Sequence, residues 1–223
     1  MTSNNQKYSL VIFDWDGTLS DSIARIVFCL EKTIDALQLE HRSHKNLKEI
    51  IGLGLNHAIL SLYPNLNEKE VNHFANTYRQ FFTTSQISGL FPGVKAMLQD
   101  LSDKGVMLAI ATGKGRSGLN SALEEVGLSH FFQASRCADE TQSKPNPAML
   151  IEILDEFGLD VKSAVMIGDS SYDIQMAQAI KMDHIGVSYG VHSKQDLVAL
   201  NAQVIFDNVK QIHQYLLQKT CAF

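Results

Sequence analysis

The chain has 223 residues, of which 45% are hydrophobic and 19% are charged, with a net charge of −5 and a pI near 5.9. This composition is typical of a globular protein of about one and a half average domains, and the acidic balance argues against nucleic acid as a partner. No apolar run approaches the ~20 residues of a membrane helix, and the polar start of the chain lacks a secretory signal. The three widely spaced cysteines, without a C-x-x-C pair, predict reduced thiols in a cytoplasmic protein (Cys29, Cys137 and Cys221).

The first predicted strand is Leu10–Phe13, an apolar run typical of a strand buried on both faces of a parallel sheet. Asp14 and Asp16 follow it and, two residues apart on an extended chain, project the same way. Ligands bind at the carboxyl ends of such strands, so these carboxylates need a cation, a shared proton or a basic partner. An EF-hand calcium loop is excluded, because its sixth and twelfth positions would be Leu19 and Arg25. The alternative left open is a plain turn with two solvated aspartates.

Residues 19–88 contain apolar positions at helical spacing and no strand pattern. Helices are predicted over about 23–37, 46–62 and 68–83, and the second is interrupted at Gly52-Leu53-Gly54. An all-helical block between strand-rich segments indicates an inserted domain, which leaves 1–18 and 89–223 as the core. We expect the glycine turn to close over the core site, with a plain corner between helices as the alternative.

After Phe91-Pro92-Gly93, helices and strands alternate. This alternation predicts an α/β fold with a doubly wound parallel sheet of five or six strands. The further strands are expected near 106–111, 131–135, 164–168, 184–187 and 203–206, and the helices at 94–101, from 117, at 147–157 and at 209–216.

Polar residues that suit phosphate chemistry follow two of these strands. Thr112 ends the second strand, and Asp169 and Asp173 follow the strand at 164–168. Carboxylates without histidine or cysteine favour Mg²⁺, which often shares its ligands with a substrate phosphate. Lys144 lies beside Pro145 and is predicted to supply the fixed cation that such a site needs, the alternative being a solvated lysine.

Taken together, these residues resemble the four motifs of haloacid dehalogenase-type phosphohydrolases. The motifs are D-x-D-G-T at Asp14–Thr18, a strand-ending Thr112, Lys144, and G-D-x-x-x-D at Gly168–Asp173. The helical block resembles the cap that this family inserts between its first two motifs, over a Rossmann-like core. Phe91-Pro92-Gly93 and Lys144-Pro145-Asn146-Pro147 further resemble the phosphoglycolate phosphatase-like branch.

The resemblance implies a magnesium-dependent phosphatase that forms an aspartyl-phosphate from a small phosphomonoester: a phosphoglycolate-like compound, a sugar phosphate or a nucleotide. Asp14 would be the nucleophile and Asp16 the general acid and base. Mg²⁺ would be held by Asp14, the Asp16 carbonyl oxygen and Asp169, with Asp173 supporting these ligands from behind. The phosphate would be bound by Thr112, Gly113, Lys114 and Lys144. The expected partner is a small phosphorylated metabolite, and the expected assembly a monomer or homodimer. A β-phosphoglucomutase-like mutase and a pyrophosphatase remain alternatives.

A different class of function is suggested by 113–118, which reads G-x-G-x-x-G after a strand and before a helix, as in dinucleotide-binding proteins. We discount it because that fingerprint normally follows the first strand and needs an acid after the next, whereas 131–135 is followed by Arg136 and Cys137. One departure from the family concerns Lys181, where relatives often have glycine. In a left-handed conformation Lys181 would cost about 1 kcal/mol relative to glycine.

Overall fold

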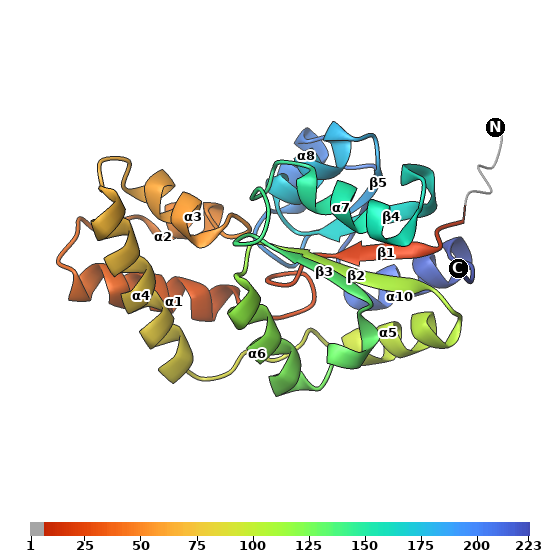
Figure 1. Ribbon diagram of the computed structural model, residues 1–223, viewed down its shortest axis with the longest axis horizontal. Helices are drawn as coiled ribbons and strands as arrows, with labels where there is room; N and C mark the ends of the chain where they lie inside the picture. The colour runs from red at the N-terminus through yellow and green to blue at the C-terminus, as the bar shows by residue number, and fades with distance from the viewer. Residues whose placement is uncertain (1–6) are drawn as a thin grey trace.

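The computed structural model describes residues 7–223 and has two parts, a sheet covered by helices and a smaller group of helices beside it (Figure 1). Residues 1–6, which the sequence analysis placed in the core and which include the polar start of the chain, lie outside the described residues. No helix within 7–223 is long and apolar enough to cross a membrane.

A six-stranded parallel sheet forms the larger part, in the order β3-β2-β1-β4-β5-β6. The prediction of a doubly wound parallel sheet is therefore confirmed. One strand was misplaced, since residues 129–131 form a 3₁₀ turn and β3 begins at Ala134. The apolar Phe131 and Phe132 that suggested a strand pack into the core instead. The strands are β1 Leu10–Phe13, β2 Met107–Thr112, β3 Ala134–Cys137, β4 Ala164–Gly168, β5 Asp183–Val187 and β6 Val204–Phe206.

Helices cover both faces of the sheet, because alternate side chains of its buried strands point to opposite sides. Val11 and Phe13 belong to the apolar cluster of one face, and Leu10 and Ile12 to that of the other. The first face is covered by α5 (Val94–Asp103), α6 (Arg116–Val126) and α10 (Val209–Lys219), and the second by α7 (Ala148–Phe157) and α8 (Ser171–Ala179). The short α9 (Lys194–Ala199) was not predicted, because a single buried residue, Leu197, shows no helical period.

The smaller part contains the four helices α1 (Ile23–Ala36), α2 (His44–Glu49), α3 (Leu55–Leu62) and α4 (Glu68–Thr84). They enclose an apolar cluster of their own that includes Leu30, Leu47, Ile59 and Phe74, all fully buried. The chain thus carries the inserted all-helical segment that was predicted, and we call it the cap. Its core lies apart from the two clusters that flank the sheet.

Two adjacent segments connect the cap to the sheet. The Asp21 N–H donates to the Gly89 carbonyl at 2.9 Å, and the Phe91 N–H to the Leu19 carbonyl at 3.0 Å. The outgoing and returning chains therefore run antiparallel and side by side. The domain limits at residues 18 and 89 fall in this paired linker and stay a prediction.

Candidate active site

Strand register brings the ends of β1, β2 and β4 together. Phe13 lies opposite Ile167 on one side and Ile110 on the other, and the Asp14 N–H extends the first ladder with a 2.9 Å hydrogen bond to the Ile167 carbonyl. Asp14 and Asp169, which directly follow β1 and β4, and Thr112, the last residue of β2, therefore share one edge of the sheet. All three are at least 99% buried.

A buried lysine joins two of the aspartates. The Lys144 Nζ lies 2.7 Å from Asp14 Oδ1 and 2.6 Å from Asp173 Oδ1. The other oxygen of Asp173, Oδ2, accepts the backbone N–H and the hydroxyl of Ser170 at 3.1 and 2.6 Å. Both Asp173 oxygens are therefore occupied by protein donors. Lys144 reaches these aspartates from the loop before α7 and forms an ion pair with each, while its role in the site stays a prediction.

Asp169 is enclosed by backbone. A Cβ on Gly17 would come within 2.2 Å of its Oδ2, and one on Gly190 within 2.1 Å, so both positions exclude any side chain. Gly17 also has φ +81°, a conformation that other residues rarely adopt. The Thr18 hydroxyl donates to Oδ1 at 3.2 Å and the Val191 N–H to Oδ2 at 2.7 Å. These donors fix the carboxylate in one orientation.

Burial dominates the electrostatics of this group. It raises the pKa of Asp14 to about 7, since the nearby Lys144 ammonium offsets only part of the cost of removing the carboxylate from water. The pKa of Asp169 is raised well above its ordinary value by burial and by the charge of Asp14. For Lys144, burial would lower the pKa, but the charges of Asp14 and Asp173 raise it above its ordinary value. The lysine therefore stays charged, while the two aspartates lack sufficient positive charge nearby.

The donor set fits a hard divalent cation. Asp14, Asp169 and Asp173 each offer an oxygen, and these oxygens lie within 4.8 Å of one another. Neither buried oxygen of Asp14 has a hydrogen-bond partner among the described residues, although Oδ1 forms the ion pair with Lys144. Carboxylate oxygens without histidine or thiol ligands favour magnesium or a similar ion. In a second group with metal-ligand spacing, Cys137 with Asp139 and Glu140, the Arg116 guanidinium binds Glu140 at 2.7 Å and the Arg116 backbone N–H binds Asp139.

Asp16 lies on the side of the site that faces the cap. Its carboxylate accepts the Ser22 hydroxyl at 2.6 Å, and Lys114 Nζ lies 3.0 and 3.1 Å from its two oxygens. The same ammonium lies 4.7 Å from the centre of the Phe82 ring of α4. Asp16 and Lys114 thus form a pair of their own beside the cluster of Asp14, Lys144, Asp169 and Asp173.

The glycine turn of the cap packs against the loop after β2. A Cβ on Gly113 would lie 2.5 Å from the Gly52 carbonyl oxygen and 2.7 Å from that of Leu53. The fully buried hydroxyl of Thr112 accepts the Lys114 N–H at 3.2 Å, which shapes the same loop. Gly113 is therefore a point of close backbone contact between cap and core.

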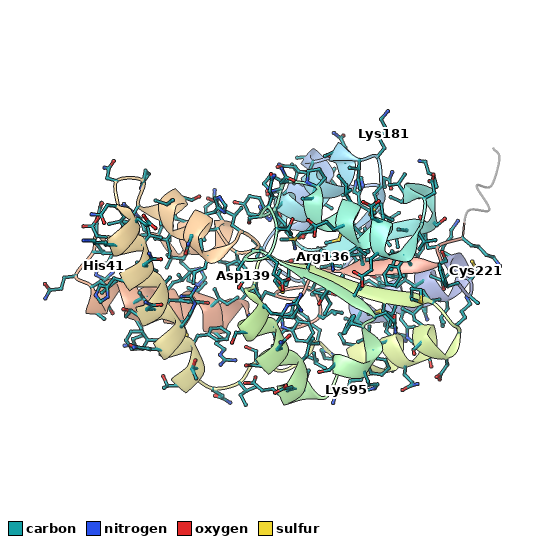
Figure 2. All side chains as sticks on the ribbon, viewed as in Figure 1. His41, Lys95, Arg136, Asp139, Lys181 and Cys221 are labelled. Atoms are coloured by element: carbon teal, nitrogen blue, oxygen red, sulfur yellow. The ribbon has the colours of Figure 1, made fainter. Side chains whose placement is uncertain are left out.

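The G-x-G-x-x-G stretch at 113–118 has a structural role at the start of α6. The argument that no acidic residue follows the next strand was wrong. Because β3 ends at Cys137, an acidic residue, Asp139, does follow it. This carboxylate accepts the Arg116 N–H at 2.9 and 3.1 Å, and a Cβ on Gly115 would lie 2.7 Å from it. The start of α6, where a pyrophosphate would bind, is thus capped by protein. Figure 2 shows Asp139 where the cap and core meet.

Sequence reasoning missed several residues around the aspartates. Ser22 directly precedes α1, and its hydroxyl binds Asp16 rather than capping the helix. Thr18 was visible within the D-x-D-G-T motif, yet no role was given to it. Gly190 and Val191 carried no signal, because only folding brings them to Asp169.

Comparison with known proteins identifies the group to which this arrangement belongs. The family model for haloacid dehalogenase-like hydrolases matches residues 11–187. The chain belongs to this family. It is 33% identical to the "Probable phosphatase IndB" of Dickeya dadantii (strain 3937), over 91% of each chain. It is 31% identical to a phosphoglycolate phosphatase of Agrobacterium fabrum, over 94% of this chain and 93% of that one.

A solved structure shows the same architecture in this family. The crystal structure of a "predicted phosphatase" from Clostridium acetobutylicum superposes with a TM-score of 0.84 at 26% identity, covering 95% of this chain and 99% of that chain. The predictions of a phosphatase-type haloacid dehalogenase-like enzyme and of the phosphoglycolate phosphatase-like branch are confirmed. The roles of individual residues remain predictions.

Proposed function

We propose that this haloacid dehalogenase-like enzyme hydrolyses a small phosphomonoester, with Asp14 as the nucleophile. The observation that carries the proposal is the state of Asp14: neither of its buried oxygens accepts a hydrogen bond from residues 7–223, and only Oδ1 has an ion-pair contact, with Lys144 Nζ at 2.7 Å. A carboxylate held rigidly by one oxygen leaves the other free to attack. Lys144, fixed by Asp173, neutralises charge on Asp14 and on the arriving phosphate.

Asp16 is suited to proton transfer. In the first step a bond forms between an Asp14 oxygen and phosphorus, the bond from phosphorus to the leaving oxygen breaks, and Asp16 gives that oxygen a proton. In the second step Asp16 takes a proton from water, the water oxygen bonds to phosphorus, and the bond to Asp14 breaks. The Ser22 hydroxyl and the Lys114 ammonium hold the Asp16 carboxylate on the cap side, where the leaving group would lie.

The resident metal would be Mg²⁺, held by Asp14, the Asp16 carbonyl oxygen and Asp169. Asp173 would support this set from behind, because its Oδ1 holds Lys144 at 2.6 Å beside Asp14 and its Oδ2 accepts the N–H and hydroxyl of Ser170. When bound, the ion would supply the positive charge that lets a phosphate approach the buried carboxylates. Thr112, Gly113, Lys114 and Lys144 would bind the phosphate oxygens.

The position of the cap supports a small substrate. Asp14 is 1% exposed and Asp16 8%, and the glycine turn of the cap contacts Gly113. A phosphoprotein could not reach carboxylates enclosed in this way, whereas a metabolite could be enclosed with them. The free cysteines agree with a cytoplasmic location.

The deciding experiment is phosphate release from a panel of phosphoglycolate, sugar phosphates, nucleotides and pyrophosphate, with and without Mg²⁺. We expect magnesium-dependent release that is lost in Asp14→Asn, because an amide cannot form the aspartyl-phosphate. An isomerised sugar phosphate without net phosphate release would favour the mutase. Saturable binding of NAD or NADP, with no hydrolysis of any ester, would contradict the proposal.

A further inference from the structure

Two hydrogen bonds join the cap segment 49–54 to the core. The Tyr172 hydroxyl of α8 donates to the Glu49 carbonyl at 2.9 Å. The Gly54 N–H donates to the Ser143 hydroxyl oxygen at 2.7 Å. The segment between these points is the turn that packs on Gly113, so one short stretch of the cap contacts the loop after β2, the loop 143–146 and the start of α8.

The two core residues in these bonds are the direct sequence neighbours of a buried ion pair. Ser143 precedes Lys144 and Tyr172 precedes Asp173, and the Lys144 ammonium lies 2.6 Å from Asp173 and 2.7 Å from Asp14. Buried charge pairs lose much of their stabilisation when their geometry is disturbed, because no water replaces the lost contact. At each of its two attachment points, the cap segment thus binds a residue that is covalently adjacent to one partner of this ion pair.

The docked segment has little room to shift. A Cβ on Gly54 would lie 2.9 Å from the Ala138 Cβ and 3.1 Å from the Ser143 hydroxyl oxygen, and one on Gly52 would lie 3.0 Å from that of Ser170. Contacts this close define a single docked position. Within the core loop, the Asn146 N–H donates to the Ser143 carbonyl at 3.1 Å. Ser143 is therefore tied to the cap through its side chain and to the loop of Lys144 through its backbone.

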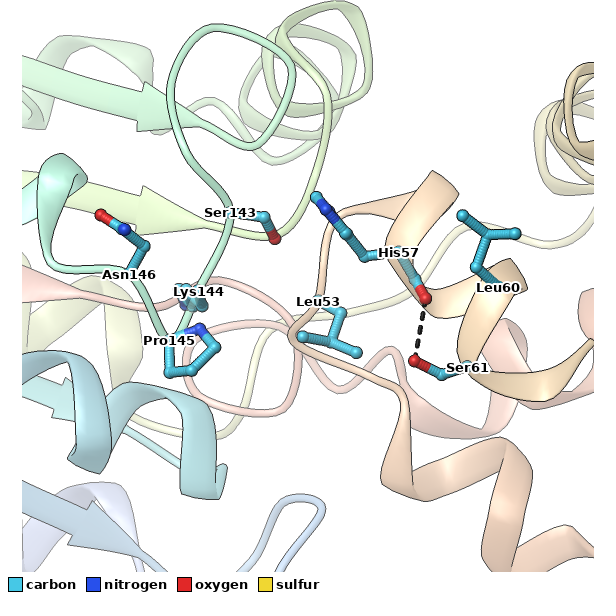
Figure 3. A pocket seen from close by; sticks show the side chains of 8 residues that line it. All are labelled: Leu53, His57, Leu60, Ser61, Ser143, Lys144, Pro145 and Asn146. Atoms are coloured by element: carbon cyan, nitrogen blue, oxygen red, sulfur yellow. Dashed lines mark hydrogen bonds between the residues drawn. The ribbon is translucent and has the colours of Figure 1, made fainter. Parts of the chain in front are cut away.

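Figure 3 shows that cap and core separate beyond this contact. A groove of about 660 Å³ opens there, with Leu53 and His57 of the cap on one wall and the loop 143–146 on the other. Ser61 lies on the cap side of the same groove, and its hydroxyl donates to the His57 carbonyl of its own helix at 2.9 Å. The bond between Gly54 and Ser143 is therefore a polar link between cap and core along this groove, whereas the bond of the Ser61 hydroxyl stays within the cap.

We propose that Ser143 and Tyr172 are positioning residues that hold Lys144 in its contacts with Asp14 and Asp173 when the cap segment 49–54 is docked. Docking gives the nearly buried Ser143 hydroxyl its donor and fixes the start of the lysine loop, and the Tyr172 bond fixes the start of α8 beside Asp173. The consequence for catalysis, which rests on the proposed function, is that phosphoryl transfer is fast only while the cap encloses the substrate.

The kinetic test uses Ser143→Ala and Tyr172→Phe, which each remove one hydroxyl and leave the charged residues intact. Each is expected to lower kcat about three- to tenfold, as the loss of one hydrogen bond allows, with KM changed less than about twofold. Ser61→Ala is the matched control, since it removes a hydroxyl from the same groove that does not link cap to core. We expect its kcat to equal that of the wild type.

A second measurement needs no substrate. In protein labelled with ¹⁵N-lysine, the buried Lys144 ammonium exchanges its protons slowly with water, and Lys144→Arg assigns its signal. Exchange is expected to accelerate about three- to tenfold in Ser143→Ala and Tyr172→Phe and to stay unchanged in Ser61→Ala.

Two results would overturn the inference. One is that the Lys144 ammonium protons exchange at the wild-type rate in both variants. The other is that the fall in kcat is fully accounted for by a smaller fraction of folded protein. The proposed function is tested separately by phosphate release from the wild type. If the wild type hydrolyses no ester, that proposal fails, while the exchange rates still decide whether the cap positions Lys144.

Discussion

The burial of Asp14 predicts that this residue destabilises the metal-free protein near neutral pH. Its pKa rises from the ordinary value of 3.8 to about 7, chiefly because burial disfavours the charged form. At a pH well below 3.8 the carboxyl is protonated in both the folded and the unfolded chain, so it has no effect on stability. As the pH rises from about 4 to about 7, the unfolded chain loses this proton while the folded chain keeps it, and the free energy of unfolding falls.

The size of the effect follows from the difference between the two pKa values. At 1.36 kcal/mol per pH unit, a rise of the pKa from 3.8 to about 7 corresponds to about 4 kcal/mol. Asp14→Asn keeps the shape of the protonated carboxyl and cannot ionise. In the presence of a chelator, Asp14→Asn should therefore be more stable than the wild type above about pH 7, and nearly equal to it at about pH 4.

Urea denaturation of both proteins across this pH range measures the difference. Asp155→Asn, which removes an exposed charge on α7, is the control and should differ from the wild type by less than about 0.5 kcal/mol. Mg²⁺ at about 100 times its dissociation constant should stabilise the wild type by about 2.7 kcal/mol, and Asp14→Asn by less. Equal free energies of unfolding of wild type and Asp14→Asn at about pH 8 would refute the argument that burial makes the ionised Asp14 carboxylate unfavourable.

Four further predictions concern single residues. Asp16→Asn should release about one phenolate per active site from an aryl phosphate and then turn over slowly, because this leaving group needs no proton but the attacking water has lost its base. Rapid mixing measures the burst, and mass spectrometry detects the phosphorylated enzyme. Equally slow first turnovers on aryl and alkyl phosphates would show that Asp16 does not transfer the proton. Lys181 is exposed with φ +58°, so Lys181→Gly should raise the free energy of unfolding by about 1 kcal/mol and Lys181→Ala should not, as measured with urea (Figure 2). Gly113→Ala would place a Cβ 2.5 Å from the Gly52 carbonyl oxygen and should lower kcat/KM about tenfold or more in steady-state assays; an unchanged value would show that the cap turn need not dock there. Cys137 is buried, and burial raises its pKa to about 12, so iodoacetamide should modify the half-buried Cys221 first. Peptide mapping identifies the modified residue, and modification of Cys137 in the folded protein would contradict this prediction.

Local pattern was sufficient to predict the strands that carry the site and the kind of residue at each strand end. The apolar runs before Asp14 and Asp169 are buried on both faces, so their hydrophobicity could be recognised without knowing any partner strand. The helical spacing of the cap was equally visible. Edge elements were harder to predict: β3 is short and half polar, and the aromatic residues before it mimicked a strand.

By itself, the sequence determined that carboxylates and a threonine would stand at the ends of strands in one parallel sheet, because these residues are covalent neighbours of the strands. Only the tertiary structure decided which of these groups pair. Lys144 contacts both Asp14 and Asp173, Lys114 binds Asp16, and Asp139 caps α6, where a nucleotide phosphate could otherwise bind. Likewise, only folding placed Ser143 and Tyr172 against the cap. These contacts join residues far apart in the chain, and their energies depend on distance, burial and orientation, which no local pattern of residues encodes.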